Sequence, residues 1–370
     1  MRIFIGADVV PTKERPNREI YSESAFVNGE VDLLFSDMLP IMRGADRVIV
    51  NLECALTEHD GAIKKIGPNI KASPLCAHTL KLAGVTDCTL ANNHVFDYGV
   101  KGLLDTTNAL KKEGILYTGI GENDRDSRRI HYIEEKGKRV AIVNVCEHEY
   151  TYALKDRMGA NPFDPFLTMA DIRQAKKNAD FVVVLYHGGK ENCPYPSPRL
   201  ANACREMAHN GASVVITQHS HCIGRYEEYE GCHILYGQGN FHFALRGEDT
   251  PWSQGLAVVL DIGERVGLEL YPFVVKDITL SLAKGEEYKE IMEPFFERNE
   301  HMKSGQWEKG WQDFCQSVKD FYIETVNGVG KTKSEDACEY FAHYLDCEAH
   351  TDVWRELYKT ANFSNEKEAE

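Results

Sequence analysis

Several short apolar segments of this chain each end on a side chain that can bind a metal ion. The segments are residues 2–7, 47–50, 87–90, 181–185 and 213–216, and the side chains that follow them are Asp8, Glu53, Asn93, His187, His219 and His221. Imidazole nitrogen with carboxylate and amide oxygen is a donor set that divalent metals accept, and a catalytic site leaves one position for water. A single histidine at the end of a strand is more often structural, but five such ends in one chain favour a metal-binding active site.

Helical segments separate these apolar runs along the chain. They are expected at residues 31–42, 74–82, 100–112, 169–177 and 198–210. Alternating strands and helices at this spacing predict βαβ units and a largely parallel sheet. Because ligands bind beyond the carboxyl ends of the strands in such sheets, we expect all five loops to meet at one edge.

The pattern changes after His221. Segments 224–229, 233–236, 256–262 and 266–275 follow one another directly, which predicts antiparallel strands that complete a second sheet. From about Gly285 the sequence is polar, helix-like and rich in aromatic residues, without a catalytic motif. We expect a main domain at residues 1–278 and a helical extension at 279–370, which packs on the domain or joins two subunits into a homo-oligomer.

The composition excludes several classes of protein. The net charge of −15 and a pI near 5.4 argue against non-specific binding of DNA or RNA, which needs clustered Lys and Arg. The 11 cysteines form no CxxC pair, and no apolar run has the length of a signal peptide or a membrane span. Together with a first strand that begins at Arg2, this predicts a cytoplasmic protein with reduced thiols and no membrane segment.

A set of short motifs carries a family resemblance. The motifs are Ala7-Asp8, Asn51-Leu52-Glu53, the run from Asn92 to Gly99, the run from His187 to Glu191, His219-Ser220-His221 and the run from Tyr236 to Phe241. In this order they resemble the calcineurin-like metallophosphoesterases, and most closely the bacterial CapA-type branch, which is associated with poly-γ-glutamate capsule synthesis. The resemblance covers roughly the first 275 residues and implies a four-layer α/β/β/α sandwich with one or two metals.

The resemblance also implies an unequal pair of metal sites. The second-metal set of the family maps completely onto Glu53, Asn93, His187 and His219. The first-metal set keeps only Asp8, Glu53 and His221, because Val9 and Val10 stand where the family's DxH motif continues to its histidine. We therefore expect one firm divalent-metal site and a second that is weak or empty, and the donors do not distinguish Mn, Fe, Zn, Mg or Ca.

Other residues in the motifs are candidates for acid–base chemistry. His94 resembles the family's histidine beside the metal and is predicted to protonate a leaving group or to stabilise charge. Asp97 is predicted to orient His94, with a plain turn as an equally good interpretation, and Glu191 is a candidate second acid or base. A structural turn is favoured for Asn240, and residues 146–150 are predicted to line the cleft. A solvated charged face is the favoured interpretation of Lys64, Lys65 and Lys71.

These features favour a metal-dependent hydrolase that directs activated water at a small anionic substrate. Two substrate classes stay open, a phosphoester and a γ-glutamyl or other peptide-like compound. A depleted two-metal site weakens the case for in-line phosphoryl displacement and leaves room for metal-assisted acid–base chemistry on a peptide. The alternative is a non-hydrolytic accessory protein of polyglutamate or capsule-type polymer synthesis, which uses the site to bind a polymer or a synthase.

Overall fold

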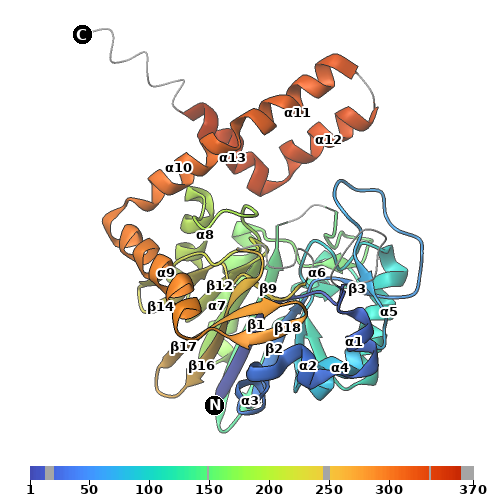
Figure 1. Ribbon diagram of the computed structural model, residues 1–370, viewed down its shortest axis with the longest axis vertical. Coiled ribbons are helices and arrows are strands. Elements are labelled where there is room, and N and C mark those ends of the chain that lie inside the picture. Colours follow the sequence, from blue (N-terminus) through green and yellow to red (C-terminus); the bar gives the residue numbers. More distant parts are fainter. Residues whose placement is uncertain (13–20, 148–149, 245–250, 333–334, 360–370) are drawn as a thin grey trace.

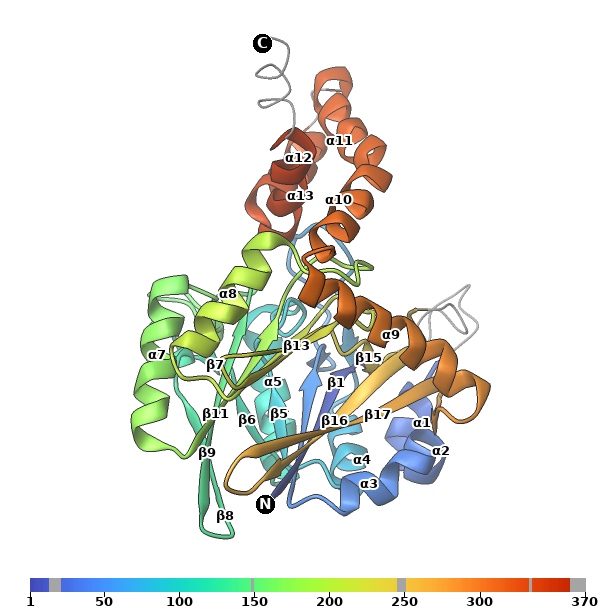
Figure 2. The same cartoon turned by 90° about the vertical axis from the view of Figure 1, so that its left-hand side faces the viewer.

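Two β-sheets packed face to face form the centre of the molecule, with helices on both outer faces (Figures 1 and 2). The computed structural model describes residues 1–12, 21–147, 150–244, 251–332 and 335–359. Apolar side chains on both faces of each sheet explain this arrangement, because a sheet that is hydrophobic on two sides must be covered on both.

The first sheet has the order β18-β17-β16-β1-β2-β5-β6, with β15 also paired to β1. The strands are β1 (Arg2–Val9), β2 (Arg47–Leu52), β5 (Asp87–Thr89), β6 (Leu116–Thr118), β15 (Asn240–His242), β16 (Gln254–Ile262), β17 (Val266–Lys276) and β18 (Thr279–Leu282). Strands β1, β2, β5 and β6 run parallel, whereas β16, β17 and β18 are antiparallel to their neighbours.

The second sheet has the order β13-β14-β12-β11-β9-β8. Its strands are β8 (His131–Glu135), β9 (Lys138–Cys146), β11 (Phe181–His187), β12 (Val214–Gln218), β13 (Tyr226–Tyr229) and β14 (Cys232–Tyr236). The four central strands are parallel and the two edge strands are antiparallel, which confirms the predicted βαβ pattern.

The prediction that all four late strands complete the second sheet is wrong for two of them. Strands β16 and β17 extend the first sheet, where β16 pairs with β1. Along β16, Leu256, Val258 and Leu260 enter the layer between the sheets, while Ala257 and Val259 pack under the outer helices. Apolar residues on both faces are the mark of a central strand, and the unbroken apolar run already contained that signal.

The helices complete four layers, as predicted. The first sheet is covered by α1 (Glu23–Asn28), α2 (Val31–Phe35), α3 (Leu39–Arg43), α4 (Cys76–Leu82) and α5 (Gly99–Lys112), and the second by α7 (Pro165–Asn178) and α8 (Pro198–His209). The single helix predicted at 31–42 is instead α2, the 3-10 turn η1 (Ser36–Met38) and α3, because the backbone breaks at Ser36, whose φ is 36°. Short elements in the connections are β3 (Ala55–Leu56), β4 (Lys71–Ala72), β7 (Ile120–Gly121), β10 (Gly159–Ala160) and α6 (Asp124–Ser127).

The C-terminal region is helical, as predicted, and it begins after β18, a few residues beyond position 278. Its helices are α9 (Glu286–Ser304), α10 (Trp307–Ser317), α11 (Lys319–Thr332), α12 (Glu335–Asp346) and α13 (Glu348–Lys359). Ile291 and Phe295 of α9 join the core between the sheets. Helices α11 to α13 stand beyond the sheets, above the ends of the parallel strands (Figure 1). Within the described residues, no helix combines the length and apolar character needed to cross a bilayer.

A partly buried ion pair of the first sheet contacts a histidine of the second sheet, away from the predicted site. Arg47 on β2 donates to Asp87 on β5 (Nε to Oδ2, 2.9 Å), and His131 Nε2 on β8 lies 2.8 Å from Asp87 Oδ1. Burial raises the pKa of Asp87, but hydrogen bonds from His131, Arg47 and Thr86 outweigh burial and hold the pKa below its ordinary value of 3.8.

We expect Asp87→Asn to lower the free energy of unfolding by about 2 kcal/mol at pH 7, because it removes a charged hydrogen-bond acceptor from three partners, Arg47, His131 and Thr86. The folded-state pKa is depressed, so this contribution is fully present above pH 3.8 and is lost as the pH falls through the folded pKa. Urea unfolding of both proteins at pH 7 and near pH 3 measures the difference. An equal gap at the two pH values contradicts the assignment.

Candidate metal centre

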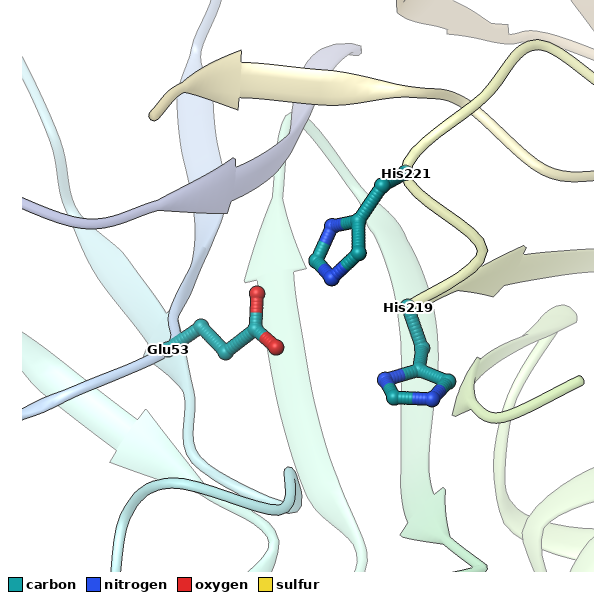
Figure 3. A group of neighbouring side chains, drawn as sticks. All are labelled: Glu53, His219 and His221. Carbon is teal, nitrogen blue, oxygen red and sulfur yellow. The ribbon is translucent and has the colours of Figure 1, made fainter. Parts of the chain in front are cut away.

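All six predicted metal-binding side chains converge at one edge of the sandwich. In the first sheet Asp8 lies at the end of β1, Glu53 follows β2 and Asn93 follows β5. In the second sheet His187 is the last residue of β11, and His219 and His221 follow β12. Ligand atoms of Glu53, His219 and His221 lie within 4.8 Å of one another, and so do those of Asp8, Glu53 and His187. Figure 3 shows the Glu53 carboxylate directed at the two imidazoles of the loop after β12.

His187, on the second sheet, contacts the three donors of the first sheet. Its Nε2 is 2.8 Å from Asn93 Oδ1 and 3.3 Å from Glu53 Oε1, while its Nδ1 is 3.7 Å from Asp8 Oδ1. One ring nitrogen therefore points to Glu53 and Asn93, the other to Asp8. His187, Glu53 and Asn93 are three of the four residues of the predicted complete set. Glu53 also lies within 4.8 Å of ligand atoms of His219 and His221. The division into one firm and one weak metal site stays a prediction.

The loop that carries His219 and His221 has an unusual backbone. Both residues have positive φ, 84° and 53°, a region that residues with a side chain rarely enter and that costs about 1–3 kcal/mol each. Two contacts hold the loop in this form: His219 N donates to Asp8 Oδ2 (3.2 Å), and His221 Nδ1 lies 2.8 Å from Asn240 Oδ1. Such strain, held by buried partners, is typical of functional loops.

Two buried carboxylates share this space. Burial, followed by repulsion from Asp8 and Glu191, raises the pKa of Glu53 well above its ordinary value, and burial also raises the pKa of Asp8. Neither carboxylate oxygen of Glu53 has a hydrogen-bond partner among the described residues. A buried carboxylate surrounded by imidazoles and a second carboxylate fits a divalent cation, which would satisfy its lone pairs and offset its charge.

Asn51 and Asn92, which precede Glu53 and Asn93 in their motifs, support the ligands from behind. Asn51 Nδ2 donates to Asp8 Oδ1 (2.7 Å) and lies 3.1 Å from His187 Nδ1, so one side chain holds a ligand from each sheet. Asn92 Nδ2 donates to Asn51 Oδ1 (3.0 Å). Asn92 Oδ1 accepts from the backbone N–H of His94 and so shapes the next loop. The sequence offered one signal for both residues, their place inside the motifs.

His94 and Asp97 form a pair, as predicted, and a lysine joins them. His94 Nδ1 is 2.7 Å from Asp97 Oδ2, and Asp97 also accepts from the backbone N–H of Ile70 (2.7 Å). Lys65 Nζ contacts the other Asp97 oxygen and lies 3.3 Å from His94 Nδ1. Burial, then repulsion from Lys65, lowers the pKa of His94. The prediction of a solvated face is wrong for Lys65, whose side chain is 4% exposed, because Asp97 holds it inside.

The remaining candidates lie farther from the donors. Glu191 Oε1 is 3.9 Å from His219 Nε2, and the Glu191 side chain is 43% exposed. Lys64 pairs with Glu339 on the surface, and Lys71 pairs with Asp60, so neither reaches the ligands. Asn240 is more than a turn residue, since its Oδ1 contacts His221 and its Nδ2 donates to the carbonyl of Trp252 (3.0 Å).

A cavity of about 410 Å³ opens beside the metal centre. From the sandwich it is lined by Asn93, His94, Gly189, Glu191 and His219, and by the loop at residues 65–68. Tyr150 also lines it, as predicted for the run 146–150, whereas His148 and Glu149 of that run lie outside the described residues. The C-terminal helices supply the opposite side, a contribution that the sequence did not predict.

Comparison with known proteins identifies the family. The model of the bacterial capsule synthesis protein PGA_cap matches residues 8–244, which is more than half of the chain. The chain belongs to this family.

Among curated relatives, the capsule biosynthesis protein CapA of Bacillus anthracis is 32% identical over 70% of this chain and 67% of its own length. The PGA biosynthesis protein CapA of Bacillus subtilis is 31% identical over 63% of this chain and 61% of its own. The aligned part thus spans about two thirds of these relatives. A solved structure of a putative 5'-nucleotidase from Staphylococcus aureus in complex with alpha-ketoglutarate is 19% identical, covers 75% of this chain and 54% of its own, and has a TM-score of 0.46.

We expect Asn51→Ala to weaken metal binding by about ten- to a hundredfold, because the substitution leaves every ligand in place but removes the side chain that orients Asp8 and His187. Calorimetric titration of this chain and of the variant, both freed of metal, with Mn²⁺ or Zn²⁺ measures the affinity. Thr107→Ala, at a buried threonine of α5 outside the site, is the control. An unchanged affinity in Asn51→Ala would show that Asn51 only fills space.

Proposed function

We propose that this member of the capsule synthesis family is a metal-dependent hydrolase whose centre is built from Asp8, Glu53, Asn93 and the three histidines His187, His219 and His221. The observation that carries the proposal is the buried Glu53 carboxylate, which has no hydrogen-bond partner among the described residues and lies within 4.8 Å of two histidine ligand atoms. A buried charged acceptor without a donor is costly unless a cation completes it.

The residues around the centre support separate roles for the metal, for His94 with Asp97 and for Glu191. A divalent metal bound there would supply activated water and polarise an oxygen of the substrate. His94, which lines the same cavity, would give a proton to the leaving group or stabilise charge, and Asp97 would hold the His94 ring and its tautomer through Nδ1. Glu191, on the cavity wall near His219, is placed to act as a second acid or base.

The substrate belongs to one of two classes in this proposal, a phosphoester or a γ-glutamyl or other peptide-like compound. The names of the relatives, which refer to capsule and PGA biosynthesis, favour the second class. Both classes carry an anionic group, and either fits a cavity of about 410 Å³, inside the range of roughly 300–1,000 Å³ for small-molecule sites.

An accessory role without hydrolysis is the second candidate. A relative in Mycobacterium tuberculosis, 25% identical over 64% of this chain, carries the name "probable polyglutamine synthesis accessory protein". The two candidates differ in what His94 does, because an accessory protein needs the shape of the site and not a proton at His94.

We expect His94→Ala to lower turnover by about a hundredfold or more while the bound metal per chain stays unchanged, since His94 is not a ligand in this proposal. The measurement is a screen of the metal-reconstituted chain over phosphoesters and γ-glutamyl peptides, with metal content determined in parallel. His78→Ala, at an exposed histidine of α4, is the matched control. Parallel losses of metal and activity contradict this role, and partner binding that survives His94→Ala without any turnover favours the accessory role.

We expect one tightly bound metal per chain, with a second binding only weakly. Val9 and Val10 are fully buried and offer no donor where the family's DxH histidine would stand, so the site with Asp8 and His221 lacks a ligand. Elemental analysis of protein purified without chelator, before and after dialysis, tests the ratio. Two tightly held metals per chain would overturn this unequal division.

A further inference from the structure

The cavity beside the metal centre has a wall that comes from the C-terminal helices. The wall contains Phe321 of α11, Tyr340, His343 and Tyr344 of α12, and His350 of α13. These residues face a space that His94, His219 and Glu191 line from the other side. Figure 2 shows α12 and α13 beyond the end of the sandwich at which the metal-binding loops lie. The region without a catalytic motif therefore reaches the candidate active site.

Polar contacts anchor this wall to the sandwich. Asp352 of α13 is buried and accepts from Ser197 Oγ (2.6 Å) and Arg199 Nε (2.9 Å) at the start of α8. Arg199 Nη2 also donates to Glu147 Oε2 (2.9 Å), and Glu147 Oε1 accepts from the backbone N–H of Gly189 (2.6 Å). Because Gly189 lies two residues after His187, one chain of hydrogen bonds connects α13 to the metal-binding loop.

A second contact lies on the other side of the cavity. Lys64 Nζ is 2.6 Å from Glu339 Oε1 of α12, next to Lys65 on the loop that lines the cavity. Tyr150 stacks on His343 with ring centroids 5.7 Å apart. The wall is thus held at both ends and has a defined position relative to the metal centre.

The wall is rich in groups that form hydrogen bonds. The hydroxyls of Tyr340 and Tyr344 are 3.1 Å apart, and the Tyr322 hydroxyl lies 2.6 Å from His350 Nδ1. The His350 ring centroid is 4.1 Å from that of Tyr344 and 5.2 Å from that of His343. Small-molecule sites are typically lined by aromatic side chains with a few placed polar groups, and the phenol and imidazole groups of this wall fit that description.

The charge of the lining points to an anion. Lys190, His343 and His350 line the cavity together with one carboxylate, that of Glu191, whereas the charge of Lys65, which also lines it, is paired with Asp97. The wall residues also lie outside residues 8–244, the part that the family model matches. The six candidate metal ligands, in contrast, lie within the matched range.

We propose that helices α11 to α13 form the specificity wall of the active site, in which His343 and His350 bind a second anionic group, a carboxylate, that the substrate carries away from its reacting bond. This inference rests on the proposed function for the reacting end and adds the recognition of the other end. It defines the substrate class as a small molecule or chain end with two separated anionic groups.

Calorimetric titration of the full-length, Mn²⁺-loaded chain tests the wall. Inorganic phosphate represents the reacting group alone, while O-phospho-L-serine and γ-L-glutamyl-L-glutamate each add a distant carboxylate. We expect His343→Ala and His350→Ala each to weaken binding of at least one carboxylate-bearing probe by about tenfold, the loss of one charged hydrogen bond, and to leave phosphate affinity unchanged. The two carboxylate-bearing probes distinguish a phosphoester from a γ-glutamyl substrate.

Controls separate recognition from folding. His301→Ala, at a histidine of α9 outside the cavity lining, should leave the affinities for all three probes unchanged. Asp352→Asn keeps every cavity side chain but weakens the anchor of α13, and it should reproduce the selective loss with unchanged metal content. Thermal unfolding of each variant shows whether it is folded.

The proposal is overturned if the wild-type chain binds neither carboxylate-bearing probe, if the histidine variants leave their affinities unchanged, or if phosphate weakens equally. These are binding measurements, so they are independent of turnover. Selective binding through the wall without hydrolysis of any substrate would overturn the hydrolase and keep the wall. Turnover that is lost in His94→Ala but unchanged in His343→Ala and His350→Ala would support the hydrolase and overturn the wall.

Discussion

The repulsion between two buried carboxylates is the constraint on which the rest of the site depends. Asp8 and Glu53 are fully buried; burial raises the pKa of both, and repulsion from Asp8 raises the pKa of Glu53 further. Neighbouring groups lower the free-energy cost of this burial: Asn51 and the backbone N–H of His219 donate to Asp8, and three imidazoles lie close by. The strained loop at residues 219–221 belongs to the same arrangement, because it places both histidine rings close to the Glu53 carboxylate.

Much of the fold could be predicted because periodicity and motif order carry it. The strands that lead to Asp8, Glu53 and His187 were visible as apolar runs, and their alternation with helices predicted parallel strands. The two-sheet sandwich followed from the family resemblance. The sheet to which β16 and β17 belong was not predicted, because strand pairing is decided by long-range packing on both faces and not by local pattern. The break of one helix at Ser36 was not predicted for a similar reason, since the positive φ of Ser36 is set by the packing around it and not by the local sequence pattern.

The candidate site, too, could be predicted only in part. Its six donors could be identified because each lies at or shortly after the end of an apolar run, whereas the side chains that hold them could not be separated from ordinary loop residues. Lys65 shows the difficulty: in the sequence it is one of two adjacent lysines, and only the fold reveals that one is buried against Asp97 while the other faces solvent. The aromatic residues of the C-terminal helices read as packing residues for the same reason, because nothing local relates residue 343 to residue 94.

The position of Asn51 has a consequence beyond catalysis. It contacts Asp8 of the first sheet and His187 of the second, and the donors around it come from both sheets in equal number. A ligand that binds only when both sheets are in place stabilises their association by the free energy of its binding. Metal occupancy and the mechanical integrity of the sandwich are therefore coupled, and a chain stripped of metal should open first where its two halves meet.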